Sequence, residues 1–375
     1  MNEQARLNEQ ARLRTHASGR DGRLPRLAVL LGVLAVAAWS YRALQTLSVP
    51  GGFEISVFAD RLAGVRTLRT GPDGMLYAVL SQQGRVVRLD PSERGEPVDV
   101  ARGLSRPYGL AFHDGWMYVG ETHQVVRFRG PSYERAEVVV PRLPTGGHWT
   151  REIVFGQDGM LYVSVGSSCN ICEEDDPRRA AVVRYRPDGS DETIVAEGLR
   201  NSAGLAVHPE TGAIWASQNE RDMLGDDLPP EEINILSDGD HFGWPYCYGG
   251  RVPNPEYRDR ANACRTTVPP ALEIQAHSAP LGMVFYTADQ FPEEYRGDLF
   301  VALHGSWNRS ERTGYKLVRV RVEGGRPLSY EDFAAGWLTA GRVSGRPVYP
   351  EVGPDGSLFL SDDDGGRIYR IRFRG

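Results

Sequence analysis

The feature that most constrains this chain is a short phrase that recurs six times along it. Each copy joins a turn, usually containing an Asp-Gly or Gly-Asp pair, to a run of apolar residues. The copies are GPDGMLYAVL at 71–80, FHDGWMYVG at 112–120, GQDGMLYVSVG at 156–166, HPETGAIWASQ at 208–218, YRGDLFVALHG at 295–305 and GPDGSLFLSDD at 353–363. Because Gly accepts the positive φ of a tight hairpin turn, each copy predicts a turn between two antiparallel strands.

Further strands flank each copy. The strands that follow are GRVVRLDP, QVVRFRGP, AVVRYRPDG, EEINILSDG, YKLVRVRVEGG and GRIYRIRFRG, and most alternate apolar and polar residues as half-buried strands do. The strands that precede are GVRTLRT, RPYGLAF, TREIVF, NSAGLAV, APLGMVFY and PVYPEV, with an outer strand such as VDVARGL or ETIVAEGL farther upstream. Four strands in each of six units predict an all-β fold, a six-bladed β-propeller.

The two ends of this repeat indicate how the ring closes. The final unit ends at GRIYRIRF without an outer strand, and the strand Phe53–Asp60 is free to supply it. Such closure hides two open sheet edges. A β-sandwich or a solenoid is the alternative, but neither needs a spare first strand. The propeller domain is therefore predicted over residues 50–375, with an insertion around 219–270.

The N-terminal residues differ in kind from the propeller. Residues 2–13 repeat NEQARL in tandem, and residues 1–26 are predicted to form a basic, disordered tail. An apolar run from Leu27 to Trp39 follows three arginines, which is typical of an export signal. We therefore expect residues 27–47 to be a signal peptide or a membrane-anchor helix.

The length of the apolar run leaves both forms of export signal open. A helix of this length spans only about 20 Å, against about 30 Å of bilayer core, so an anchor must continue to Leu47 with Arg42 at the interface. Small residues at Ala35 and Ala37 offer a cleavage site instead, and a buried core helix is a third alternative. Either export signal places residues 48–375 outside the cytoplasm, in the periplasm or tethered to the inner membrane.

Charge narrows the possible partners. Residues 1–47 contain seven Arg and three acidic residues, whereas the rest contains 36 basic and 46 acidic residues, a net charge of −10. An acidic globular domain argues against nucleic acid as a partner, because phosphates need a basic face.

The four cysteines fit an oxidising compartment. Cys169 and Cys172 form C-N-I-C, and Cys247 and Cys264 lie 17 residues apart, so we expect sequence-local disulfides. A redox-active pair or half of a zinc site is the alternative for C-N-I-C.

Candidate site residues follow from the propeller register. The starts of the inner strands and the same-side loops surround one mouth of the channel, where they form a concave polar site suited to an anionic ligand with several oxygens. The polar residues at these positions are Arg106, Tyr108, His148, Arg151, Asn201, His277, Ser278 and Arg346 on strand starts, and Gln82, Glu121, Ser167, Asn219, Asp222, His304, Asn308, Arg309 and Asp362 on loops.

His148 is the most specific of these candidates. It lies in PTGGHWTREIVF, where two glycines let the backbone approach a ligand closely, and a His can accept a proton near neutral pH. The alternative is a channel His satisfied by hydrogen bonds. Arg151 and Arg346 are either ligand clamps or structural ion-pair partners.

An acidic loop offers a possible metal site. Its oxygen-rich side chains suit Ca²⁺ but lack EF-hand spacing, and a solvated acidic loop explains them equally well. They are Asn219, Glu220, Asp222, Asp226, Asp227 and Glu231.

Several segments together carry a family resemblance. They are GLRN at 198–201, HPETG at 208–212, DDLPPEEIN at 226–234, FGWP at 242–245, HSAPLGMVFY at 277–286, GDLFVALHGSWNRS at 297–310 and PDGSLFLSDDDGGRIYRI at 354–371. In this combination the chain resembles, over roughly residues 50–375, the pyrroloquinoline quinone (PQQ)-dependent sugar dehydrogenases, the soluble glucose and L-sorbosone dehydrogenase-like group.

The resemblance implies a propeller that holds PQQ with Ca²⁺ over the channel mouth. It implies His148 as the catalytic base, which takes a proton from the sugar hydroxyl as hydride moves to the quinone. The cofactor contacts expected from the resemblance and the register are Asn201, Arg346, Arg151, Asn219 and Arg309, and the Ca²⁺ contacts, partly through backbone carbonyls, are Glu220, Arg221 and Asp222.

The chain departs from the family pattern at two places. Glucose-oxidising members carry a second Arg where Val348 stands, and a Gln-Gly-Pro near calcium reads Asn219-Glu220-Arg221 here. Loss of one guanidinium could weaken PQQ binding by about 1.5–3 kcal/mol. A calcium-dependent, lactonase-like hydrolase and a non-catalytic binding propeller are therefore the competing functions. An enzyme of the expected kind also needs an external electron acceptor, because the chain has no haem-attachment motif.

Overall fold

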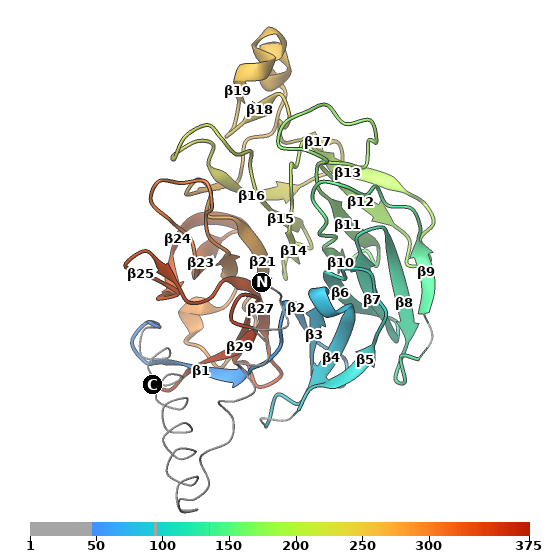
Figure 1. Cartoon of the computed structure of the whole chain (residues 1–375), viewed down its shortest axis with the longest axis vertical. Coiled ribbons are helices and arrows are strands. Elements are labelled where there is room, and N and C mark those ends of the chain that lie inside the picture. The colour runs from blue at the N-terminus through green and yellow to red at the C-terminus, as the bar shows by residue number, and fades with distance from the viewer. Residues whose placement is uncertain (1–46, 94–95, 135) are drawn as a thin grey trace, which may run out of the picture. The chain divides into compact units, whose positions relative to one another are not determined.

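The computed structural model describes residues 47–93, 96–134 and 136–375. Its strands form six four-stranded antiparallel sheets, arranged as blades around a central channel (Figure 1). The innermost strands are β2 (Val65–Thr70), β6 (Gly109–His113), β10 (Ile153–Phe155), β14 (Gly204–Val207), β21 (Pro280–Phe285) and β27 (Pro347–Val352). The six-bladed β-propeller predicted from the repeat is confirmed.

The remaining strands of each blade lie successively farther from the channel. The second strands are β3 (Leu76–Leu80), β7 (Trp116–Glu121), β11 (Leu161–Val165), β15 (Ile214–Gln218), β22 (Leu299–Leu303) and β28 (Leu358–Asp362). The third strands are β4 (Arg85–Leu89), β8 (Gln124–Arg129), β12 (Ala181–Tyr185), β16 (Glu231–Leu236), β23 (Lys316–Glu323) and β29 (Arg367–Phe373). The outer strands are β5 (Val98–Ala101), β9 (Ala136–Val140), β13 (Thr193–Glu197), β20 (Leu272–Ile274), β24 (Arg326–Ala334) and β1 (Phe53–Ala59).

The ring closes through β1, as predicted. This strand pairs antiparallel with β29, from Phe53 opposite Phe373 to Ala59 opposite Ile368. Phe53 also packs edge-on against Phe291 and Phe333, with ring centroids 4.7 and 5.0 Å apart. The first strand is therefore fixed by both backbone pairing and aromatic packing.

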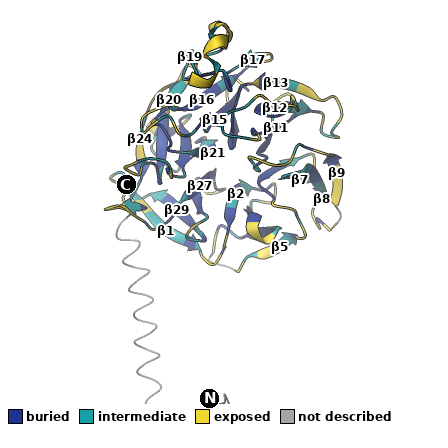
Figure 2. Cartoon of the chain, turned by 45° about the horizontal axis from the view of Figure 1, so that its top comes forward, coloured by how far each residue is buried: buried dark blue, intermediate teal, exposed yellow. Residues whose placement is uncertain are grey.

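The hydrophobic core is divided among the interfaces between blades. All five residues of β3 are buried, because each face of the blade packs against a neighbour. Figure 2 shows buried residues filling the blade strands, whereas exposed residues gather on outer strands and on the insertion that contains the 3₁₀ helix η2 (Pro255–Arg265). Such blades hold the inner strand starts rigidly around the channel.

Several short strands and 3₁₀ helices lie outside the four-stranded blades. β17 (Asp240–His241) extends the third blade by parallel pairing with β13. Two short antiparallel pairs are β18 (Cys247–Tyr248) with β19 (Val252–Pro253) and β25 (Leu338–Thr339) with β26 (Arg342–Val343). The 3₁₀ helices are η1 (Ser81–Gln83), η2 (Pro255–Arg265) and η3 (Glu293–Tyr295). The Cys247–Cys264 disulfide joins β18 to η2, and Cys169–Cys172 forms the second disulfide, so both predicted pairings are confirmed.

The chain enters the propeller shortly before β1. Ser48 forms an isolated bridge with Ala335, and Leu47 packs against the neighbouring core. The predicted tail (1–26) and nearly all of the predicted signal or anchor segment (27–47) lie outside the described residues. Among the residues that are described, no helix is both long enough and apolar enough to cross a bilayer.

Candidate active site

A polar cavity of about 390 Å³ opens where the inner strands begin. The register argument expected a site at this mouth, and eight of its residues line the cavity together with residues that it did not single out. The lining side chains are Arg66, His148, Trp149, Thr150, Arg200, Asn201, Asn219, Glu220, Asp222, Glu231, His277, His304, Trp307, Asn308 and Arg346, with Gly147, Ala203, Ala279, Leu281 and Gly305.

His148 enters the cavity from the loop before β10, and its ring orientation is fixed. Its Nδ1 lies 3.0 Å from both the carbonyl oxygen and Oγ of Ser167. A carbonyl oxygen can only accept, so Nδ1 carries the proton and Nε2 presents a lone pair. No described residue forms a hydrogen bond to Nε2, which leaves it available as a base.

The surroundings of His148 keep its imidazole neutral. Burial, followed by the positive charge of Arg200, lowers the pKa of His148 from 6.5 to about 4. Arg151 and Arg179 add to this effect. At neutral pH the ring is therefore unprotonated and competent to accept a proton.

Glycine at position 166 allows two site residues to approach each other. A Cβ there would lie 2.6 Å from Asn201 Oδ1 and 2.6 Å from His148 Cβ. Gly147, with φ of 63°, has its own Cβ position blocked by Ser168. These glycines let the loop before β10 and the loop after β11 pack closely on one side of the cavity.

Arg200 organises the neighbouring wall. Its Nη1 donates to the carbonyl oxygens of Asn219 (3.1 Å) and Glu220 (2.7 Å), and its Nη2 lies 3.2 Å from Asp222 Oδ2. The side chain is nearly fully buried. The positively charged guanidinium of Arg200 therefore lies beside residues that were predicted to bind Ca²⁺.

Carboxylates accumulate beside Arg200. Glu231 Oε2 accepts from the Glu220 amide at 2.7 Å, and its Oε1 accepts from the Ala279 amide at 3.0 Å. Burial raises the pKa of Glu231 to about 8 and also raises the pKa of Glu220. Burial therefore makes it costly for these two carboxyl groups to carry their charge.

The opposite wall is built by Arg346 and His304. Arg346 donates from Nε to the His304 carbonyl oxygen (3.1 Å) and from Nη2 to that of Gly305 (3.0 Å). His304 Nε2 lies 2.9 Å from Asp363 Oδ1, yet burial lowers the pKa of His304 to about 4. Arg66 pairs with the same Asp363 at 2.6 Å.

The floor of the cavity is apolar. Val348, which replaces the second family Arg, is fully buried in a cluster with Ala203, Leu281 and Tyr349. Ala203 and Leu281 also line the cavity. Val348 therefore contributes apolar packing where the family has a guanidinium, and the nearby Arg69 lies over the Tyr349 ring at 4.5 Å.

Three residues predicted as ligand contacts do not line the cavity. Arg151 is fully buried and donates to the carbonyl oxygens of His148 (3.0 Å) and Thr150 (2.7 Å), so it supports the His148 loop. Arg221 turns to Glu256 at 2.5 Å, and Arg309 bonds the carbonyl oxygen of Asp226. Local polar partners hold all three guanidiniums in place, although Arg151 Nε has no hydrogen-bond partner among the described residues. Sequence register does not reveal such partners.

The backbone carbonyls expected to contact Ca²⁺ accept hydrogen bonds from within the protein. The Glu220 carbonyl is taken by Arg200, and the Asp222 carbonyl accepts from Asn170 Nδ2 at 3.2 Å and Arg221 Nε at 3.2 Å. Within the described chain, the one group of three potential ligand atoms lying within 4.8 Å of one another is Cys169, Cys172 and Glu174.

Residues missed by the sequence argument include Arg66, Trp149 and Trp307. Trp149 follows His148 directly, and Trp307 lies in the same loop as Asn308, so both were adjacent to recognised positions. Arg66 lies in GVRTLRT, the weakest strand copy, where register was least certain.

Known proteins resemble this chain in both sequence and fold. A family model described as TrAA12-like matches residues 47–373. The chain belongs to this family. The family resemblance predicted from the sequence segments is thereby confirmed.

Named relatives agree with this membership. The chain is 28% identical over 326 residues to an aldose sugar dehydrogenase of Escherichia coli, covering 80% of this chain and 77% of that protein. It is 24% identical over 410 residues to a pyrroloquinoline quinone-dependent sugar dehydrogenase of Hypocrea jecorina, covering 90% and 89%. The fold matches a Trichoderma reesei carbohydrate-active enzyme of family AA12 with a TM-score of 0.76, at 22% identity over 87% of this chain and 97% of that one.

Proposed function

We propose that this protein is a PQQ-dependent sugar dehydrogenase, an oxidoreductase that acts at the polar mouth of the channel. The observation that carries the proposal is His148, a neutral imidazole with an available Nε2 in a cavity bordered by guanidiniums. Membership of the TrAA12-like family and the relatives named above support the same activity.

The residues present fit PQQ, a planar quinone that carries carboxylates. Arg66, Arg200 and Arg346 line the cavity and can pair with carboxylates, and Asn201 adds an amide. The buried Asn308 Oδ1 has no hydrogen-bond partner among the described residues, so the wall retains an unsatisfied acceptor. We propose Arg200, Arg346, Asn201 and Asn219 as the cofactor contacts.

The chemistry divides between the cofactor and the protein. When bound, PQQ supplies the acceptor for the hydride that leaves the sugar carbon. His148 Nε2 accepts the proton of the sugar hydroxyl, and Ser167 holds the ring in the required tautomer. Ala203 and Leu281, which pack against Val348, add apolar surface to the cavity lining.

The rim supports a sugar as the substrate. Trp307 lines the cavity yet is 73% exposed, and Met223 is 71% exposed on the neighbouring loop. Asp222 and Asn308, adjacent in sequence to these residues, are hydrogen-bonded at 2.9 Å. An exposed indole beside amide and carboxylate groups matches the alternating apolar and hydroxylated faces of an aldose ring.

Calcium is the second part of the proposal. The carboxylates of Glu220, Asp222 and Glu231 are hard oxygen ligands, and burial raises the pKa values of the two glutamates, so a bound cation would stabilise their charged forms. Because their oxygens are not gathered within 4.8 Å of one another, ion binding requires these side chains to draw together. Addition of Ca²⁺ should therefore raise the melting temperature, and Glu231→Gln should weaken that response.

Export is the third part of the proposal. Two disulfides and no free cysteine among the described residues fit an oxidising, extracytoplasmic location. We propose a periplasmic location, with residues 27–47 as signal or tether and an external electron acceptor. Cell fractionation of the full-length chain tests the location, and a cytoplasmic protein with free thiols would contradict it.

Reconstitution tests the activity itself. Purified protein is mixed with PQQ and Ca²⁺, and reduction of an artificial dye is followed over a panel of aldoses and sorbosone. Sugar-dependent reduction is expected. Lactone hydrolysis without PQQ would favour the hydrolase instead, and absence of both PQQ binding and turnover would favour a non-catalytic propeller.

A further inference from the structure

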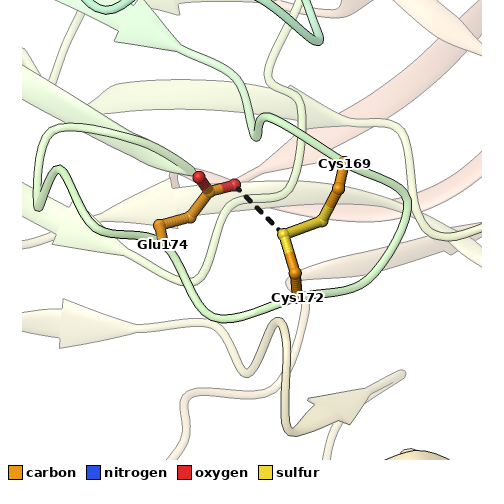
Figure 3. Close-up of side chains that lie close together, drawn as sticks. All are labelled: Cys169, Cys172 and Glu174. Atoms are coloured by element: carbon orange, nitrogen blue, oxygen red, sulfur yellow. Dashed lines mark hydrogen bonds between the residues drawn. A yellow bond between two sulfur atoms is a disulfide. The ribbon is translucent and has the colours of Figure 1, made fainter.

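A small disulfide loop lies directly beside the cavity. Cys169 and Cys172 are joined across a sequence separation of three, shortly after β11. Figure 3 shows this disulfide with Glu174 turned toward it, and Glu174 Oε1 lies 3.9 Å from Cys172 Sγ. Because the sulfurs are bonded to each other, this group is a covalent clamp and not a metal site.

One residue inside the clamp contacts three distant segments. Asn170 Oδ1 accepts from Arg200 Nη2 at 2.9 Å and from the Asp222 amide at 2.8 Å. Its carbonyl oxygen accepts from Arg200 Nε at 3.0 Å and from Trp244 Nε1 at 3.2 Å. Its Nδ2 donates to the Asp222 carbonyl oxygen at 3.2 Å. Asn170 therefore fixes the guanidinium plane of Arg200 through two parallel hydrogen bonds.

The same loop also reaches His148. Ser167 Oγ donates to the Cys169 carbonyl oxygen at 2.7 Å, and this orients Oγ to accept from His148 Nδ1. The base and the main cavity arginine are thus both held through residues on one short loop. Asn170 itself does not line the cavity.

We propose that the loop closed by Cys169 and Cys172 is a positioning element, in which Asn170 sets Arg200 and the Ser167–Cys169 contact sets His148. This inference deepens the proposed function and rests on it. Asn170 is a positioning residue, because it acts on the reaction only through Arg200 and Asp222.

The position of Arg200 has a measurable electrostatic consequence. After burial, the charge of Arg200 is the largest cause that lowers the pKa of His148. An Arg200 released from Asn170 would move and weaken this effect, so the pKa of His148 would rise toward 6.5. The charged groups around His148 and along the adjoining wall are Arg151, Arg179, Arg200, Glu174, Asp222, Glu220 and Glu231, and none of them is changed in the variants below.

The test compares Asn170→Ala with Ile171→Ala, a matched change in the same loop. The pKa of His148 is measured by NMR titration of the protein without cofactor, and PQQ affinity is measured by equilibrium dialysis. For Asn170→Ala we expect a raised His148 pKa and about tenfold weaker PQQ binding, the effect of losing hydrogen bonds to a charged group. Ile171→Ala should change neither.

The double variant Cys169→Ser, Cys172→Ser opens the same loop and provides a second test if Asn170→Ala does not fold. It should reproduce both effects while retaining the circular dichroism spectrum of the propeller. Equal His148 pKa values in wild type, Asn170→Ala and the double variant would overturn the inference. If the wild type binds no PQQ, the proposed function fails, whereas the titration still decides whether Asn170 positions Arg200.

Discussion

The two mouths of the propeller channel have cavities of similar size and opposite chemistry. The cavity at the strand starts has a volume of about 390 Å³ and contains two arginines bonded to loop carbonyls, His148 and several carboxylates. The cavity at the strand ends has a volume of about 360 Å³ and is walled by Phe112, Phe155, Phe285 and Met283. Volume therefore does not identify the site, and the distribution of polar groups does.

The difference follows from the connections at each mouth. Four of the six inner strands are joined to the next strand by tight Asp-Gly turns, whose residues are needed by the turn itself. The strand starts receive longer loops, which can carry His148, Arg200 and Asn308 over the channel. Charged residues at the second mouth, Arg69 and Glu351, belong to a buried ion-pair cluster with Glu152.

The largest expected effect is a loss of catalysis when His148, at the polar mouth, is replaced. His148→Ala should lower kcat by about 10²–10⁴-fold, because a positioned general base is lost. PQQ affinity should change little, since His148 bonds the protein through Ser167. Steady-state kinetics with dialysis of PQQ checks both values, and unchanged kcat would remove His148 from the mechanism.

The second effect concerns cofactor affinity. Arg346→Ala should weaken PQQ binding by about 10–100-fold, which corresponds to about 1.5–3 kcal/mol for a charged hydrogen bond. Arg374→Ala, an exposed residue paired with Glu54, serves as the matched control and should leave affinity unchanged. Equal affinities in the two variants would show that Arg346 only supports the loop carbonyls of His304 and Gly305.

The third effect concerns the pH profile of kcat/KM, whose fall at acid pH should be shifted to lower pH. Because burial and Arg200 lower the pKa of His148 to about 4, the base stays unprotonated as pH falls through 6.5. At pH 5.5, kcat/KM should therefore be about tenfold higher than an unperturbed imidazole allows. A fall of kcat/KM with its midpoint near pH 6.5 in the wild type would contradict this electrostatic account of the polar mouth.

The smallest effect is expected at the apolar mouth. Met283→Leu conserves volume, so it should cost less than about 1.5 kcal/mol of stability and leave kcat and PQQ affinity unchanged. Thermal denaturation and kinetics measure these quantities together. A loss of activity comparable to that of Arg346→Ala would show that the two mouths are coupled through the channel.

Sequence reasoning recovered the parts of the molecule that repeat. Blade strands and ring closure follow from periodicity, because alternation and turn chemistry act locally, and β1 was recognised as the strand missing from the last blade. Side-chain direction in irregular loops was beyond this reasoning. Arg151 and Arg200 both precede inner strands, yet only Arg200 lines the cavity, because Arg151 donates to carbonyl oxygens of its own loop.

The same limit applies to the calcium prediction. Asn219, Glu220 and Asp222 line the cavity as expected, but hydrogen bonds from Arg200 reach the carbonyls of Asn219 and Glu220. Val348 shows the reverse case, because the sequence identified a missing charge, whereas only the structure shows that Val348 is buried against Ala203 and Leu281.

The most direct test of the account is hydrogen exchange of the protein with and without PQQ. Binding at the polar mouth predicts slower exchange in the loops around residues 145–150, 199–203 and 304–309, and no change around 207–212 and 286–290 at the other mouth. Protection at the apolar mouth, or no protection anywhere at saturating PQQ, would contradict it.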